Sequence, residues 1–161
     1  MRVIKVKNKS KITGKFRFIF SDPITKEVTQ TTDWQENLIS NADTCGHNLF
    51  LRHLYGDITY PLEITRARFG TTNVTPLDTH TDIDSPLAYD IEIASKEINS
   101  TIQRTWFFFA PSVFIPDDTY YTFACYAGNK VFGMHLLDSP LVKSGSTDIT
   151  IEYSYTVNNV V

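Results

Sequence analysis

Apolar and polar residues alternate with a period of two along much of the chain, which is the pattern of β-strands with one face in a core. The alternation is clearest in residues 11–20, where the even positions from Phe16 onward are aromatic. Residues 21–23 are Ser, Asp and Pro, a combination that favours a turn. We therefore expect residues 27–32 to fold back on the first strand as a hairpin.

One stretch, residues 42–55, has helical periodicity, with three leucines within two turns. Asn41 or Asp43 could cap its first turn, and Gly56 lies where a left-handed residue would end it. Gly46 is the residue within this stretch that disfavours a helix. The sequence predicts one short helix near residues 42–55.

Further strands are predicted where apolar segments are bounded by Gly, Pro, Asn or Asp. They are residues 62–69, 88–94, 101–110, 120–126, 130–136 and 147–157. Parallel βαβ units would need a helix after nearly every strand, and the chain does not provide them. We expect an all-β fold, an antiparallel β-sandwich or jelly roll with one short helix.

Composition supports this fold and sets the number of domains. The chain has 161 residues, of which 13% are aromatic, and this length suits a single β-sandwich domain over residues 1–161. No apolar run approaches the roughly 18 residues that span a bilayer. Because charged and aliphatic residues alternate from the first positions, we expect neither a signal-sequence export route nor a membrane partner.

The two cysteines, Cys45 and Cys125, lack the C-x-x-C spacing of zinc or redox sites. They can form one disulfide or remain as two buried thiols. We favour two buried thiols, because free cysteine behaves as a small apolar residue.

Charge is distributed unevenly along the chain. The net charge is −3, yet residues 1–17 contain seven basic residues and no acid, so the rest of the chain carries −10. Such an acidic remainder would repel phosphates, and we expect no nucleic-acid partner. Residues 1–17 are instead predicted to form a basic edge strand or arm that contacts a neighbouring subunit, because edge lysines direct which strands can pair.

A second interface candidate is residues 106–109, which place aromatic side chains on both faces of a strand. Either the strand is central and a helix or loop covers its outer face, or another subunit completes one face. The interface candidates are Arg2, Lys5, Lys7, Lys9, Lys11, Trp106, Phe107, Phe108 and Phe109.

Motifs for chemistry are scarce. The chain has no nucleophile elbow, Gly-rich phosphate loop, H-E-x-x-H or EF-hand loop. Residues 78–84 hold Asp78, Asp82 and Asp84, which we interpret as a solvated turn-forming loop, with a calcium site as the alternative. A metal cluster of Cys45, His47 and His53 would match no common zinc pattern. We expect no catalytic residue, no metal and no cofactor.

Residues 69–79 contain Gly70, Thr71, Pro76, Asp78 and Thr79 in the spacing G-T-x-x-x-x-P-x-D-T. This segment resembles one common in small virion structural proteins of tailed bacteriophages. Upstream, residues 34–39 resemble the W-x-x-N stretch of that family. Downstream, residues 122–134 resemble its paired strands, and residues 137–157 resemble its apolar-x-x-Pro ending and closing strand.

The segment also makes physical sense as a structural loop. Gly70 is expected to let the backbone leave its strand in a conformation closed to other residues, and Pro76 to stiffen the loop. Asp78 and Thr79 are expected to hydrogen-bond the loop's own amides. A loop held in this way is a fixed protrusion suited to contact with another subunit.

The resemblance implies a structural component of a tailed-phage virion, made in the host cytoplasm and assembled in multiple copies. Its partners would be other virion proteins and further copies of this chain. A receptor- or glycan-binding module of a fibre or baseplate is the alternative, because sugar faces stack on exposed Trp and Tyr. An enzyme such as a polysaccharide depolymerase is the least favoured reading, because the sequence shows no recognisable set of catalytic residues.

Overall fold

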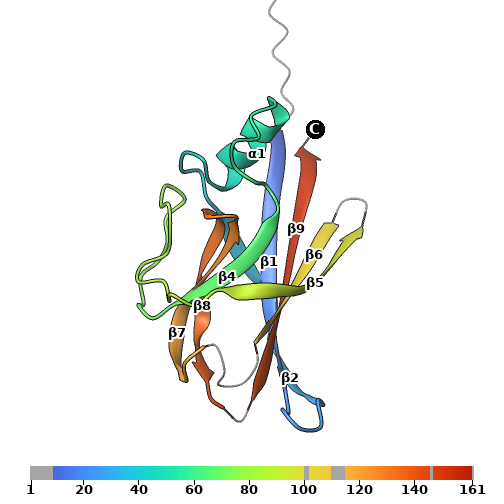
Figure 1. Ribbon diagram of the computed structural model, residues 1–161, viewed down its shortest axis with the longest axis vertical. Coiled ribbons are helices and arrows are strands. Elements are labelled where there is room, and N and C mark those ends of the chain that lie inside the picture. The colour runs from blue at the N-terminus through green and yellow to red at the C-terminus, as the bar shows by residue number, and fades with distance from the viewer. Residues whose placement is uncertain (1–8, 100–101, 110–114, 146, 161) are drawn as a thin grey trace, which may run out of the picture.

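A computed structural model describes residues 9–99, 102–109, 115–145 and 147–160. Nine strands and one helix occur in these ranges, in keeping with the alternating pattern (Figure 1). They are β1 (Lys9–Ser21), β2 (Val28–Thr31), β3 (Gln35–Ile39), α1 (Gly46–Leu54), β4 (Ile64–Gly70), β5 (Ile91–Asn99), β6 (Ile102–Phe109), β7 (Asp118–Ala127), β8 (Lys130–Lys143) and β9 (Asp148–Val160).

The strands form one strongly curled sheet in the order β2-β1-β3-β8-β7-β4-β5-β6-β9, and β9 pairs again with β1. Every pairing among these strands is antiparallel. The predicted all-β antiparallel class with one short helix is confirmed. The finer expectation of a two-layered sandwich or jelly roll stays a prediction.

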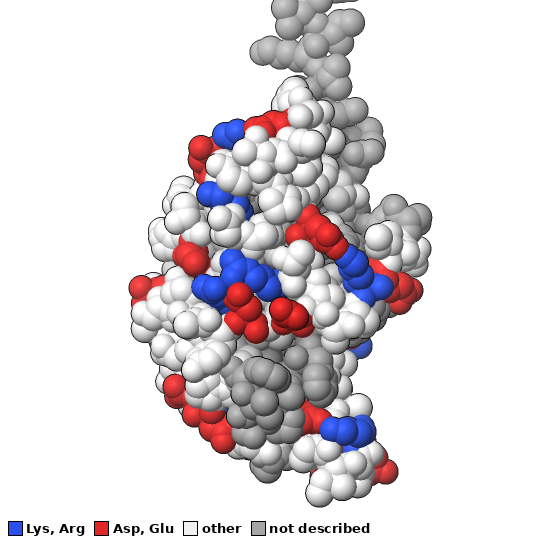
Figure 2. All heavy atoms as spheres, viewed as in Figure 1, with Lys and Arg blue, Asp and Glu red and all other residues white. Residues whose placement is uncertain are grey.

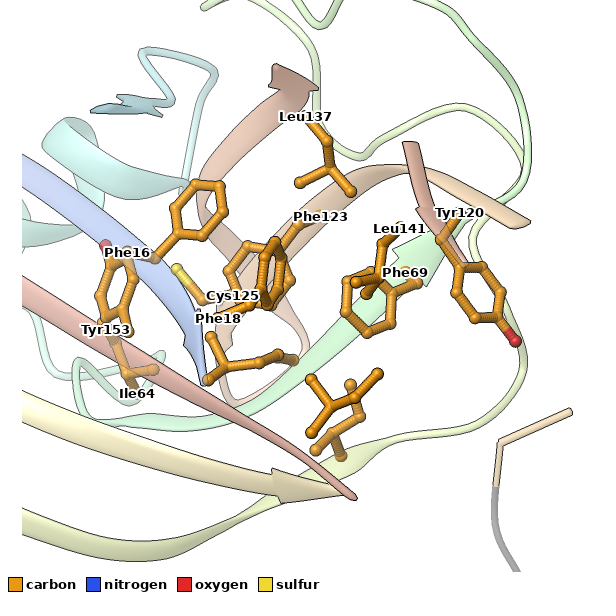
Figure 3. Close-up of a cluster of buried hydrophobic side chains, with 14 of the residues drawn as sticks. Phe16, Phe18, Ile64, Phe69, Tyr120, Phe123, Cys125, Leu137, Leu141 and Tyr153 are labelled. Atoms are coloured by element: carbon orange, nitrogen blue, oxygen red, sulfur yellow. The ribbon is translucent and has the colours of Figure 1, made fainter. Parts of the chain in front are cut away.

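The core lies inside the curl and combines aromatic with aliphatic side chains (Figure 3). Phe16 packs against Phe123 with ring centroids 5.0 Å apart, and Phe69 stacks on Tyr120 at the same distance. Each of these four side chains is fully buried. At about 2 kcal/mol per buried aromatic side chain, this cluster links β1, β4 and β7 into one unit.

Helix α1 begins four residues later than predicted. Cys45 occupies its N-cap with no side-chain capping bond, so neither Asn41 nor Asp43 serves as the cap. Thr44 and Gly46 both have positive φ, so the chain turns sharply before the helix. A side chain at position 46 would lie 2.3 Å from a backbone oxygen, which explains a glycine there. Gly56 ends the helix with φ +83°, as predicted.

The position of β1 differs from the predicted edge strand over part of its length. Its partner on one side is β9 along all of residues 9–21. On the other side, residues 14–16 pair with β3 and residues 19–21 with β2. The prediction of an edge is therefore wrong for residues 14–16, because β3 and β9 pair with this segment on its two sides. Residues 1–8 lie outside the described part of the chain.

Strand β6 is central, with β5 on one side and β9 on the other. That position agrees with the first of the two readings of residues 106–109. What covers their side chains lies outside the described residues. Cys45 and Cys125 are both buried and not joined to each other, so the favoured reading of two buried thiols is confirmed. Within the described ranges, no helix is long and apolar enough to cross a membrane.

Candidate functional site

Residues 69–79, the segment identified in the sequence, include the start of a long loop, residues 71–90. The two ends of this loop lie close together beside the end of β4. Gly70 forms an isolated bridge with Pro86, and the Leu87 N–H donates to the Phe69 carbonyl at 2.8 Å. Thr72 Oγ1 donates to the Asp84 carboxylate at 2.6 Å, joining the two limbs of the loop. These bonds fix the loop at its base.

Gly70 acts differently from the expectation. It has no positive φ, so the backbone leaves β4 without a conformation reserved for glycine. A Cβ atom at this position would instead lie 2.2 Å from Thr122 Oγ1 and 2.9 Å from the Asp84 carbonyl oxygen. Glycine is required because the returning limb and β7 approach the backbone closely.

The middle of the loop is attached to the segment that leads into α1. The Asn41 N–H donates to the Asp78 carbonyl at 2.6 Å, and the Asn41 side-chain amide donates to the Asp78 carboxylate at 3.0 Å. Ser40 Oγ donates to the carbonyl of His80 at 3.0 Å. The expectation that Asp78 would bond the loop's own amides is therefore wrong. Its partner is Asn41, 37 positions away.

The other residues of the predicted structural loop have different surroundings. Pro76 is buried, Thr71 is half-buried and Thr79 is exposed. That Pro76 stiffens the loop through its fixed φ stays a prediction.

A third attachment joins the loop to the outer face of β7. The Tyr126 hydroxyl donates to Asp82 Oδ1 at 2.5 Å, and the Ile83 N–H donates to the same oxygen at 2.8 Å. Burial of the phenol raises the pKa of Tyr126 far above its ordinary value, and the hydrogen bond to Asp82 raises it further. Tyr126 is therefore a neutral donor at neutral pH.

Arginines of β4 lie beside this contact. Arg66 donates from Nη1 to both carboxylate oxygens of Asp90, and Arg68 donates from Nε to one of them at 2.5 Å. Burial opposes ionisation of Asp90, but the bonds from Arg68 and Arg66 outweigh it and lower the Asp90 pKa below its usual value. Figure 2 shows basic side chains bordered by acidic ones near the middle of this face. Arg66 and Arg68 share the one carboxylate of Asp90, so these three side chains hold the end of the loop and together carry a net charge of +1.

Apolar side chains are exposed at the end of α1. Leu51, Leu54 and Tyr55 share one face of the helix by their spacing, and Ile58 follows in the next turn of chain. Leu54 is 64% exposed, Ile58 76% and Tyr55 88%. We call these four residues the α1-end patch. Val74 and Leu77 add two more exposed apolar side chains on the loop.

The structure separates the residues that the sequence proposed as interface candidates. Lys9 and Lys11 lie at the beginning of β1, and residues 106–109 lie in the central strand β6. Arg2, Lys5 and Lys7 fall outside the described residues. Sequence reasoning missed the α1-end patch, because the leucines of residues 42–55 were used only as evidence of helical periodicity. Only Leu49 of the three is buried.

The acidic loop does not gather its carboxylates. Asp78 bonds Asn41, Asp82 bonds Tyr126 and Asp84 bonds Thr72. Within the described part of the chain, no group of three or more His, Cys, Asp or Glu side chains lies close enough to hold a metal ion. This statement covers both the aspartates of residues 78–84 and the Cys45, His47 and His53 set.

Comparison with protein-family models, with curated proteins and with solved structures found no match to this chain.

Proposed function

We propose that this protein is a structural subunit of a tailed-phage virion that assembles in multiple copies through contacts between subunits. The phage assignment rests on the resemblance of residues 69–79 and of the segments around them. The proposed place of the protein is the virion, after synthesis in the host cytoplasm, with other virion proteins and copies of itself as partners. The proposed role is not enzymatic.

The observation that carries the assembly proposal is the α1-end patch. Exposing four large apolar side chains to water at one end of a small domain is unfavourable, and a partner that covers them lowers the free energy. At about 25 cal/mol per Å² of apolar surface, covering such side chains is the usual driving force for association between subunits. Their clustering on one helix end favours a protein partner.

The fixed loop supports the same proposal. Three separate attachments, at Gly70, Asp78 and Asp82, hold residues 71–90 against the sheet and the α1 segment. A contact element that is already ordered loses little conformational entropy on binding. Val74 and Leu77 are the exposed apolar residues that this loop presents.

The test compares two double variants, each of which replaces two exposed apolar side chains with serine, by sedimentation velocity over a range of protein concentrations. One variant, Leu54→Ser with Tyr55→Ser, removes two exposed side chains of the α1-end patch. The control, Ile24→Ser with Val28→Ser, removes exposed apolar side chains of the β1–β2 hairpin. We expect the wild type and the control to form the same oligomer, and the first variant to dissociate at concentrations where they do not.

Equal dissociation of both variants, or of neither, would contradict the assignment of the patch. Circular dichroism and thermal unfolding would verify that both variants remain folded. Loss of the fold in the first variant would be resolved with the single change Tyr55→Ser, since that side chain is almost wholly exposed.

The glycan-binding alternative has one favourable observation. Tyr55 exposes an aromatic ring on which a sugar could stack. The Trp34 ring, in contrast, is approached at 4.6 Å by both Lys15 and Arg17, which occupy part of the surface that a sugar would need. A saturable signal on a glycan array that Tyr55→Ser abolishes would favour this second function.

A further inference from the structure

The first part of β1 has one open backbone edge. Residues 9–13 pair with β9 on one side. On the other side, pairing with β3 begins only at Gly14, opposite Asn37, and β3 then turns away to pair with β8 through Leu38 and Ile39. Among the described residues, no strand accompanies residues 9–13 on that side. Alternate N–H and C=O groups there face away from β9 without a strand partner.

A groove of about 530 Å³ lies where β1 and β3 diverge. One wall is Ile12–Lys15 of β1, and the other is Leu38, Ile39, Asn41 and His47 from the end of β3 and the start of α1. In Figure 1 α1 lies beside the beginning of β1. The groove is also lined by Glu36 of β3 and by Ser154 and Thr156 of β9, and Lys15 on its β1 wall is exposed.

The lysines of residues 9–13 lie opposite neutral residues in the register of β1 with β9. Further along β1, Arg17 lies opposite Glu152 on β9 and forms an ion pair with it at 2.8 Å. Lys9 and Lys11 instead lie opposite Val160 and Asn158, which are neutral. Across from Lys15 on β3 is Glu36, but β3 does not extend beside the two lysines.

We propose that the open edge of residues 9–13 binds an extended acidic segment of a partner protein as an added antiparallel or parallel strand. The proposal deepens the assembly function proposed above and rests on it. A second copy of the same edge is a poor occupant, since its lysines would face these lysines directly. An acidic segment satisfies the unpaired backbone groups and the lysines together.

The alternation of β1 fixes the pattern of the added strand. Odd positions carry Lys9, Lys11 and Thr13, whereas Ile12 at an even position is buried. Directly opposed residues in a sheet share a face. The partner is therefore expected to alternate acidic residues, opposite the odd positions, with small aliphatic residues facing Ile12 and Ile39.

The test uses the full chain and a synthetic peptide of about eight residues with glutamate and valine at alternating positions and blocked ends. Isothermal titration calorimetry should detect binding to the wild type, and affinity should fall as NaCl rises from about 50 to about 500 mM. The same peptide with lysine in place of glutamate should not bind measurably.

Two double variants separate this edge from general electrostatic attraction. Lys9→Glu with Lys11→Glu should weaken binding of the acidic peptide by at least about tenfold and permit binding of the lysine peptide. Lys96→Glu with Lys130→Glu makes the same charge change on β5 and β8, away from the groove, and should alter affinity by less than about twofold. Equal losses in both double variants would overturn the proposal.

Amide hydrogen exchange locates the added strand. In the free protein, alternate amides of residues 9–13 should exchange quickly and the others, which face β9, slowly. The acidic peptide should slow only the fast set. Protection of β2, whose edge is also open in the strand order, or protection of all five amides before peptide is added would contradict the proposal.

The outcomes distinguish this proposal from the assembly function. A protein that is monomeric at all concentrations but still binds the acidic peptide at β1 would refute self-assembly and leave the edge site intact. An oligomer that does not bind the peptide, with residues 9–13 still exchanging, would retain assembly and refute the edge site.

Discussion

Tyr126 on β7 and Asp82 in the long loop are joined by a 2.5 Å hydrogen bond across 44 positions of sequence. The phenol is buried, and Arg66 lies 4.9 Å from its ring centroid. The bond therefore links the loop to the same region of the sheet that holds the Arg66 and Asp90 pair. The position of the loop therefore depends on the Tyr126–Asp82 hydrogen bond to the sheet beneath it.

Removing the Tyr126 hydroxyl should loosen the loop. We expect Tyr126→Phe to lower the free energy of unfolding by about 1–3 kcal/mol, because it removes a bond to a charged partner from a buried site. Urea unfolding measures this loss, and amide exchange should accelerate around Asp82 first. Tyr55→Phe, at an exposed position, is the control and should change the free energy by less than about 0.5 kcal/mol. An equal effect of both changes would refute the role of this bond.

A methyl group at Gly70 should push both β7 and the returning limb of the loop away from the end of β4. We expect Gly70→Ala to cost about 2 kcal/mol, since its Cβ would overlap Thr122 Oγ1. A double-mutant cycle with Thr122→Ala checks the cause, because removal of the hydroxyl should restore part of the loss. Strictly additive effects of the two changes would show that the contact is not responsible.

His135 should make stability depend on pH below neutrality. Burial lowers its pKa, and the opposing influence of nearby Asp138 and Glu36 is smaller. The unfolded chain, with a histidine pKa of about 6.5, therefore binds the proton more readily than the folded protein does. Stability is then fully present above about pH 6.5 and decreases as the pH falls below it.

Thermal unfolding between about pH 8 and pH 5 measures this dependence. His135→Gln should flatten the slope relative to the wild type, whereas His47→Gln, which changes a different histidine, should retain the slope. A steeper slope in His135→Gln would contradict the assigned sign.

Local patterns were enough to predict the strand content. The aromatic alternation at Phe16 and Phe18 marks the buried face of β1, and both side chains are in the core. Helix α1 begins late because Thr44 and Gly46 turn the chain sharply, a feature that hydrophobic periodicity does not report. Strand β3 has only five residues. Strand β8 continues through Pro140 to Lys143, and Pro140 lies at the irregularity in the pairing of β8 with β7, where a proline is tolerated.

The contacts of the candidate surface join residues that are far apart in the sequence, and no local pattern predicts such pairs. Asp78 was identified as a loop residue, yet its partner Asn41 follows from how the loop folds back on the α1 segment. Tyr126 gave no signal beyond its place in an apolar strand. The α1-end patch was visible as leucines at helical spacing, but spacing alone does not say which of them the core covers.

We propose that the chain assembles with copies of itself through the α1-end patch. Native mass spectrometry of the full chain, from low to high micromolar concentration, measures the number of copies directly. We expect one defined oligomer that Leu54→Ser with Tyr55→Ser converts to monomer. A wild type that is monomeric throughout that range, or an oligomer unaffected by the variant, would contradict it.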